Sequence, residues 1–130
     1  MQPEDNKALV RRFFQEGLAG LDPAVVDDVF APRHVLSSPA LGAEEVTGTE
    51  VIKSAIEEFR GDGGGVRCTI ERQIAEGNWV ATSYTLTQGG QDHVGLMLSR
   101  VAGGRIRESR VVASDVSGPD ERGTARKAFN

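Results

Sequence analysis

Cysteine is nearly absent from this chain of 130 residues, and several other absences narrow its possible functions. Cys68 is the single cysteine, so no internal disulfide can form and no cysteine-based metal site can be built. No apolar run approaches the roughly 18 residues that cross a bilayer. Residues 1–7 are polar and lack the apolar core of a signal peptide. We therefore expect a cytoplasmic protein that does not bind membranes.

Clustered positive charge is also missing. The chain has 15 Lys and Arg against 19 Asp and Glu, a formal net charge of -4, and its basic residues are interleaved with acids. Binding of nucleic acid needs clustered Lys and Arg, so we expect no nucleic-acid partner. Hydrophobic residues at 38% and charged residues at 26% are typical of a globular protein. The length fits one domain.

The first half of the chain carries three apolar patterns of helical period. In Asn6–Gly20 the apolar residues recur at spacings of three and four, which predicts an amphipathic helix capped by Asp5 or Asn6. A short second helix is expected from the Asp22-Pro23 pair to Phe30, ended by Pro32. A third is expected after Thr49 and should end at the glycine-rich stretch 61–65.

The remaining patterns are those of β-strands. A short strand is expected over Arg33–Ser38, followed by a loop over Pro39–Gly48. Four segments with alternating polarity and tight turns predict an antiparallel meander, namely 66–74, 79–87, 92–101 and 105–114. The order of elements predicts an α+β domain over residues 1–116, in which a strongly curved antiparallel sheet covered by three N-terminal helices encloses one pocket. Residues 117–130 are expected to form a loose tail.

One residue is out of place in this pattern. Arg72 interrupts an inward-facing row expected to contain Val66, Cys68, Ile70 and Ile74. It could anchor an acidic ligand, or extend its charged end to solvent.

Several stretches resemble known motifs in a consistent order. Asn6–Phe14, Asp22–Pro32, Ile74–Ala81 and Gly104–Glu108 are similar to motifs of the nuclear-transport-factor-2-like superfamily, in particular its SnoaL-like polyketide cyclase branch. The resemblance covers about residues 6–115. It implies a cone-shaped α+β barrel, a homodimer, and a deep pocket for a small hydrophobic metabolite. Known members include aldol-type cyclases, ketosteroid isomerase and limonene epoxide hydrolase.

The residues that carry chemistry in these families are replaced here. The oxyanion-binding tyrosine of ketosteroid isomerase corresponds to Phe14, its general base to Ser38, and its second oxyanion donor to Met97. The histidine and aspartate of the "EHWD" motif of SnoaL-like cyclases correspond to Ser109 and Val111. Since serine and valine cannot act as tuned bases, the usual mechanisms lack their carboxylates. The resemblance places these five side chains at the pocket.

Polar residues that remain are candidates for catalysis. We predict catalytic roles for Tyr84, which could donate to a ligand carbonyl, for His93, a natural acid–base group, and for Ser109. Tyr84 could equally be a core residue, and His93 a half-exposed hairpin residue. Thr82 shares a strand face with Tyr84 and is expected to contact substrate, whereas His34 is expected to pack in the core or at its rim. We expect no metal, because the histidines are far apart without paired acids, and no cofactor.

Two functions from different classes follow. The first is a cyclase or isomerase of a small, polyketide-like metabolite that works mainly by positioning its substrate. The second is a non-catalytic protein that binds or sequesters such a compound. A third, a protein–protein adaptor, is disfavoured because the outer sheet face is expected to be polar, with Arg67, Glu71, Arg107 and Glu108.

Overall fold

The computed structural model describes residues 2–39 and 45–116, and for residues 114–116 the backbone alone. The predicted tail, 117–130, and the middle of the predicted 39–48 loop lie outside the described residues. In chain order the elements are α1 (Pro3–Arg12), the π-helix η1 (Phe13–Leu18), α2 (Ala24–Val29), β1 (Phe30–Ser37), β2 (Val46–Thr47), α3 (Glu50–Gly61), β3 (Val66–Glu76), β4 (Trp79–Gln88), β5 (Gln91–Ala102) and β6 (Arg105–Val116). The predicted α+β class is confirmed. Within the described ranges, no helix is both long enough and apolar enough to cross a membrane.

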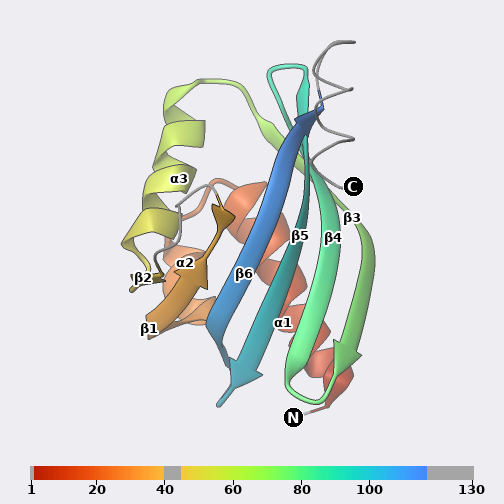
Figure 1. Ribbon diagram of the computed structural model, residues 1–130. Coiled ribbons are helices and arrows are strands. Elements are labelled where there is room, and N and C mark those ends of the chain that lie inside the picture. Colours follow the sequence, from red (N-terminus) through yellow and green to blue (C-terminus); the bar gives the residue numbers. More distant parts are fainter. Residues whose placement is uncertain (1, 40–44, 117–130) are drawn as a thin grey trace.

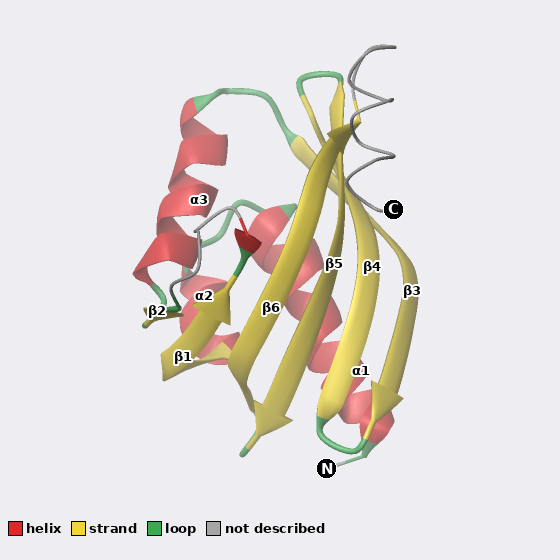
Figure 2. Ribbon diagram, in the orientation of Figure 1, coloured by secondary structure: helices red, strands yellow, loops and turns green. Residues whose placement is uncertain are grey.

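The strands form one curved sheet that does not close, with the helices on one face (Figures 1 and 2). Its order is β2-β1-β6-β5-β4-β3. Strands β3 to β6 form the predicted antiparallel meander. β1, however, pairs with β6 in parallel, so the expected all-antiparallel sheet is wrong at this pair. A parallel neighbour needs a long crossover, and here the chain between β1 and β6 includes α3 and four strands, β2 to β5.

The first helix is longer and less regular than predicted. It begins at Pro3, not at Asn6, and the Gln2 N–H donates to the Asp5 carboxylate over 3.3 Å. From Phe13 on it widens into a π-helix, which ends with the Ala19 N–H donating to the carbonyl five residues earlier, that of Phe14. Such π-helical turns are rare in proteins, and those that occur often lie at functional sites. This one carries three side chains into the interior, those of Phe13, Phe14 and Leu18.

The second helix ends earlier than predicted. It stops at Val29, and Phe30 already has extended backbone angles and begins β1. Pro32 therefore does not end the helix but lies exposed inside β1, where the register with β6 shifts between Phe30 and Val35. At the other end, the Asp22 carboxylate accepts the N–H of Ala24, the first residue of the helix, over 3.0 Å.

The predicted faces of β3 are wrong after Ile70, because the strand contains a β-bulge. Its register with β4 shifts between Ile70 and Arg72, so Glu71 is the extra residue. Beyond the bulge the faces are exchanged. Ile74, expected to face inward, is 59% exposed, and Gln73 faces inward in its place. Arg72 no longer interrupts an apolar row, because it lies on the exposed side.

Gln73 joins the first helix to the sheet. Its Oε1 accepts a hydrogen bond of 2.8 Å from Arg11 Nη1. Its Nε2 donates to the Lys7 carbonyl over 3.1 Å and to Thr82 Oγ1 over 3.2 Å. One inward-facing amide therefore fixes α1 against β3 and β4.

The outer face of the sheet is less polar than expected. Leu96, Leu98 and Val112 are 46%, 38% and 38% exposed there, and Leu96 pairs directly with Val112 across β5 and β6. The ion pair between Arg100 and Glu108, at 3.2 Å, borders this apolar area. The expectation of a polar outer face therefore fails at the centre of the sheet.

Candidate ligand-binding cavity

A cavity of about 260 Å³ lies between the helices and the inner face of the sheet. Its lining comes from η1, β1, α3 and the three central strands, and the residues that line it are Phe13, Phe14, Leu18, Phe30, His34, Leu36, Ser38, Val51, Ile52, Ala55, Tyr84, Met97, Ser109 and Val111. Among these described residues there is no Asp, Glu, Lys or Arg. Since a cavity of about 150 Å³ holds benzene, this one has room for roughly ten non-hydrogen atoms.

Most of the side chains predicted to contact substrate lie at this cavity. Phe14, Ser38, Met97 and Val111 line it, together with two predicted catalytic residues, Tyr84 and Ser109. They come from η1, from the residue that follows β1 and from the inward-facing positions of β4, β5 and β6. The structure thus brings together residues that are up to 97 positions apart, from Phe14 to Val111. Their roles stay predictions.

Thr82 and His93 are not among the described residues that line the cavity. Thr82 is fully buried, and its hydroxyl accepts the hydrogen bond from Gln73, so it contributes to packing under α1. His93 is half-buried near the start of β5, two positions before Gly95 on the same strand face. The predicted catalytic role of His93 stays a prediction.

The structure adds a polar pair that the sequence did not predict. His34 is fully buried, and its Nε2 lies 2.8 Å from Ser109 Oγ, which is also buried. The imidazole packs edge-on against Phe30, with ring centroids 4.7 Å apart. Burial lowers the pKa of His34 to about 4, although the charge of Glu108 raises it slightly. His34 is therefore neutral near pH 7.

The pair was missed because it depends on the parallel pairing of β1 with β6. The register places Leu36 opposite Ser109, so His34 and Ser109 come from neighbouring strands. A signal was nevertheless present in the sequence. Phe30, His34, Leu36 and Ser38 all line the cavity and occupy even positions, a strand pattern broken only at Pro32.

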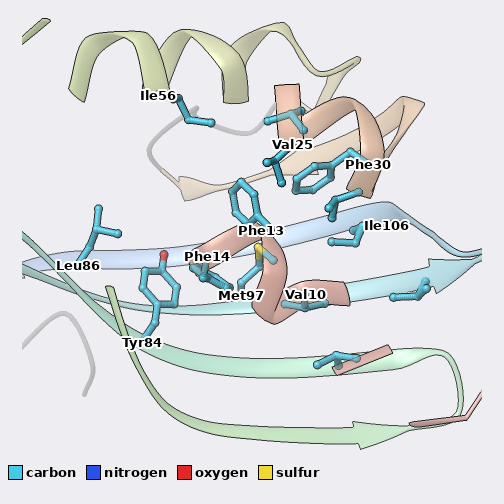
Figure 3. Close-up of a cluster of buried hydrophobic side chains, with 14 of the residues drawn as sticks. Val10, Phe13, Phe14, Val25, Phe30, Ile56, Tyr84, Leu86, Met97 and Ile106 are labelled. Atoms are coloured by element: carbon cyan, nitrogen blue, oxygen red, sulfur yellow. The ribbon is translucent and has the colours of Figure 1, made fainter. Parts of the chain in front are cut away.

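Tyr84 crosses a gap that a glycine leaves open. A Cβ on Gly95, its partner on β5, would lie 2.4 Å from both Cζ and Oη of the tyrosine. The ring also packs against Phe14, with centroids 4.6 Å apart, and Figure 3 shows it extending from β4 across the neighbouring strands, with the hydroxyl at its far end. Burial raises the pKa of Tyr84 to about 12, so the hydroxyl keeps its proton and can donate.

Comparison with known families agrees with this arrangement. A family model described as a SnoaL-like domain matches residues 10–109. The chain belongs to the SnoaL-like domain family. The resemblance inferred from its motifs is thereby confirmed. No curated protein matches this SnoaL-like chain.

Solved structures share the fold of this SnoaL-like protein. A proposed ketosteroid isomerase from Kribbella flavida is 24% identical, with a TM-score of 0.73, over 90% of this chain and 83% of that one. An LEH-like epoxide hydrolase from M. tuberculosis is 20% identical, with a TM-score of 0.70, over 98% and 93% of the two chains. A proposed SnoaL-like polyketide cyclase from Jannaschia sp. is 22% identical, with a TM-score of 0.68, over 85% and 86%. At these identities the likeness establishes the fold and leaves the chemistry to the cavity.

Proposed function

We propose that this SnoaL-like protein binds a small, uncharged, mostly apolar metabolite in the cavity and promotes its cyclisation or isomerisation. The observation that carries the proposal is the lining. Nearly all of it is apolar, and Tyr84 and Ser109 contribute hydroxyl groups without any charged side chain among the described lining residues. Apolar walls with a few converging polar groups are typical of small-molecule sites. A charged ligand would lose its hydration there without gaining a counter-ion.

The proposed chemistry is catalysis by positioning. A reactive ketone chain held in a folded geometry needs less activation, and orientation can supply up to about 7–11 kcal/mol in favourable cases. Hydroxyl donors can stabilise negative charge that develops on a carbonyl oxygen. Hydrolysis is less well supported, because no carboxylate that could activate a water is among the described residues that line the cavity. A ketone that has already enolised in water needs no such base, since the enol carbon attacks the second carbonyl while the enol proton passes to the new hydroxyl oxygen.

The alternative is a protein that holds a compound without converting it. The same absence of lining carboxylates favours this function, since proton abstraction is the step that the cavity is least equipped to perform. The two functions predict the same ligands and differ in turnover.

The test uses the model substrate heptane-2,6-dione, whose intramolecular aldol condensation gives a cyclic enone that absorbs in the ultraviolet. Binding is measured by calorimetry and turnover by the absorbance of the enone. Ala55→Leu adds three carbon atoms to the wall, which fill roughly a third of the cavity at about 25 Å³ per carbon. Ser54→Leu, on the exposed side of the same helix, is the matched control.

We expect the wild type and Ser54→Leu to bind the diketone and to accelerate enone formation. In Ala55→Leu we expect at least a tenfold loss of both binding and enone formation. Tyr84→Phe should weaken binding by no more than about three- to tenfold, the effect of one hydrogen bond, and reduce turnover further, because it removes a donor with little change in shape. Binding without conversion would establish the alternative function instead. If Ala55→Leu binds as well as Ser54→Leu does, the cavity is not the binding site and both functions are wrong.

A further inference from the structure

We propose that Ser109, oriented by His34, is the hydrogen-bond donor that binds a carbonyl-type oxygen of the ligand, and that His34 is a positioning residue. This inference rests on the proposed function and specifies the ligand of the same cavity. Ser109 is a side chain that touches the ligand, whereas His34 acts through Ser109. The ligand is accordingly an uncharged ketone or a related oxygen acceptor.

The proton of His34 can be assigned from its surroundings. Nε2 is 2.8 Å from Ser109 Oγ, and Nδ1 is buried with no hydrogen-bond partner among the described residues. A buried N–H without an acceptor is rarer than a buried acceptor without a donor. We therefore assign the proton to Nε2, which donates to Ser109 Oγ and leaves Nδ1 as a bare acceptor. An imidazole neutral at physiological pH allows this arrangement.

This assignment determines what Ser109 offers to the cavity. Its oxygen accepts from His34, so its own proton remains available for another acceptor. No acceptor for that proton was found within the described part of the chain, and Ser109 lines the cavity, so an oxygen of the ligand is the available acceptor. Accepting a hydrogen bond also polarises the hydroxyl, which strengthens its donation.

A second hydrogen-bond donor, the Tyr84 hydroxyl, lies further along the sheet and indicates a second acceptor on the ligand. From Ser109 every second residue of β6 is Val111, which lines the cavity, and then Ala113, which is exposed and pairs with Gly95 beside the Tyr84 hydroxyl. Four residues span about 13 Å along a strand. The two donors are thus separated by the apolar surface of Met97 and Val111. This spacing favours a ligand with an apolar middle and an oxygen acceptor toward each end.

The first experiment tests the assignment without any ligand. The imidazole ¹⁵N shifts of His34, measured by NMR at neutral pH, distinguish a protonated nitrogen from a bare one. The expected result is a protonated Nε2 and a bare Nδ1. A protonated Nδ1 would mean that Ser109 donates to His34 and has no proton for the ligand, which overturns the inference whether or not the cavity binds ketones.

The second experiment measures binding of the bicyclic ketone 1-tetralone and of its parent hydrocarbon, tetralin. Ser109→Ala and His34→Phe should each weaken 1-tetralone binding about three- to tenfold and leave tetralin binding unchanged, since one net hydrogen bond is lost. The double variant should lose no more than either single variant, because both act through one donor. His34→Gln, which places an amide N–H near the position of Nε2, should restore 1-tetralone binding and is the second variant should His34→Phe fail to fold.

Ser99→Ala is the matched control, since it removes an equally buried hydroxyl directly opposite Ser109 that does not line the cavity. It should leave 1-tetralone binding unchanged. Equal losses for tetralin and 1-tetralone in Ser109→Ala would overturn the inference while the proposed binding function stands. Failure of both probes to bind the wild type would count against the proposed function, and the NMR result would still decide the orientation of the pair.

Discussion

Substitution of Gly95 by alanine tests the packing of Tyr84 more directly than any change to the tyrosine itself. The backbone of Gly95 does not have a positive φ, so alanine is compatible with its conformation. The nearest obstacle is the tyrosine ring, since the added Cβ would lie 2.4 Å from Cζ and Oη and 2.9 Å from Cε1. Ordinary contacts are about 1 Å longer, so the ring must move.

The cost follows from two opposing effects. Forcing a ring out of a packed position costs about 1–3 kcal/mol. Replacing glycine by alanine in an unstrained strand returns about 0.4–1 kcal/mol, because the unfolded chain loses conformational freedom. Gly95→Ala should therefore destabilise the protein by about 1–2 kcal/mol. In a Tyr84→Leu background, where the clashing atoms are gone, the same change should be neutral or slightly stabilising.

Urea unfolding of the four variants of this double-mutant cycle measures the difference, with a coupling energy of about 2 kcal/mol expected. Gly65→Ala, where a methyl group meets nothing within 4 Å, serves as the control and should not destabilise. If Gly95→Ala costs the same free energy with and without the Tyr84 ring, the ring does not occupy the space over Gly95 and the placement of its hydroxyl is wrong.

Three further predictions concern other parts of the fold. His34 has a folded-state pKa of about 4 against an ordinary value of 6.5, so the unfolded chain takes up the proton first. Its contribution to the free energy of unfolding should fall by about 3 kcal/mol as the pH drops from 6.5 to 4, and His34→Gln should remove this component from a pH series of urea unfolding. Gln73→Ala should destabilise by about 1–3 kcal/mol, whereas Thr85→Ala, which removes an exposed hydrogen bond to Glu71, should cost under about 0.5 kcal/mol. Leu98→Arg should convert the homodimer that the family resemblance implies into a monomer, as light scattering would show, and a monomeric wild type would contradict this expectation.

The elements with strict periodicity could be predicted from the sequence. Strand β4 is the clearest case, because Val80, Thr82, Tyr84 and Leu86 alternate without interruption and all four are buried. The predicted residues that line the cavity follow from such faces and from the family resemblance. Beyond Ile70 in β3 the prediction fails because of one extra residue, at the bulge that turns Ile74 outward.

The His34–Ser109 pair shows a second limit. Periodicity describes each strand alone, whereas which strands become neighbours depends on the whole sheet. Because β1 and β6 are about 70 residues apart and pair in parallel, no local pattern could place an imidazole beside Ser109. The π-helical turn could not be predicted from the sequence either, since apolar spacings of three and four are equally typical of an α-helix.

The β-bulge at Glu71 divides β3 into two parts that have different roles in the fold. Before the bulge, the inward-facing side chains of Val66 and Ile70 pack in the apolar interior. After the bulge, Gln73 forms hydrogen bonds with α1. Because the bulge separates the two parts, substitutions in one part do not change which side chains of the other part face inward. A lineage could therefore repack the apolar interior under the upstream part while Gln73 keeps its hydrogen bonds to the first helix.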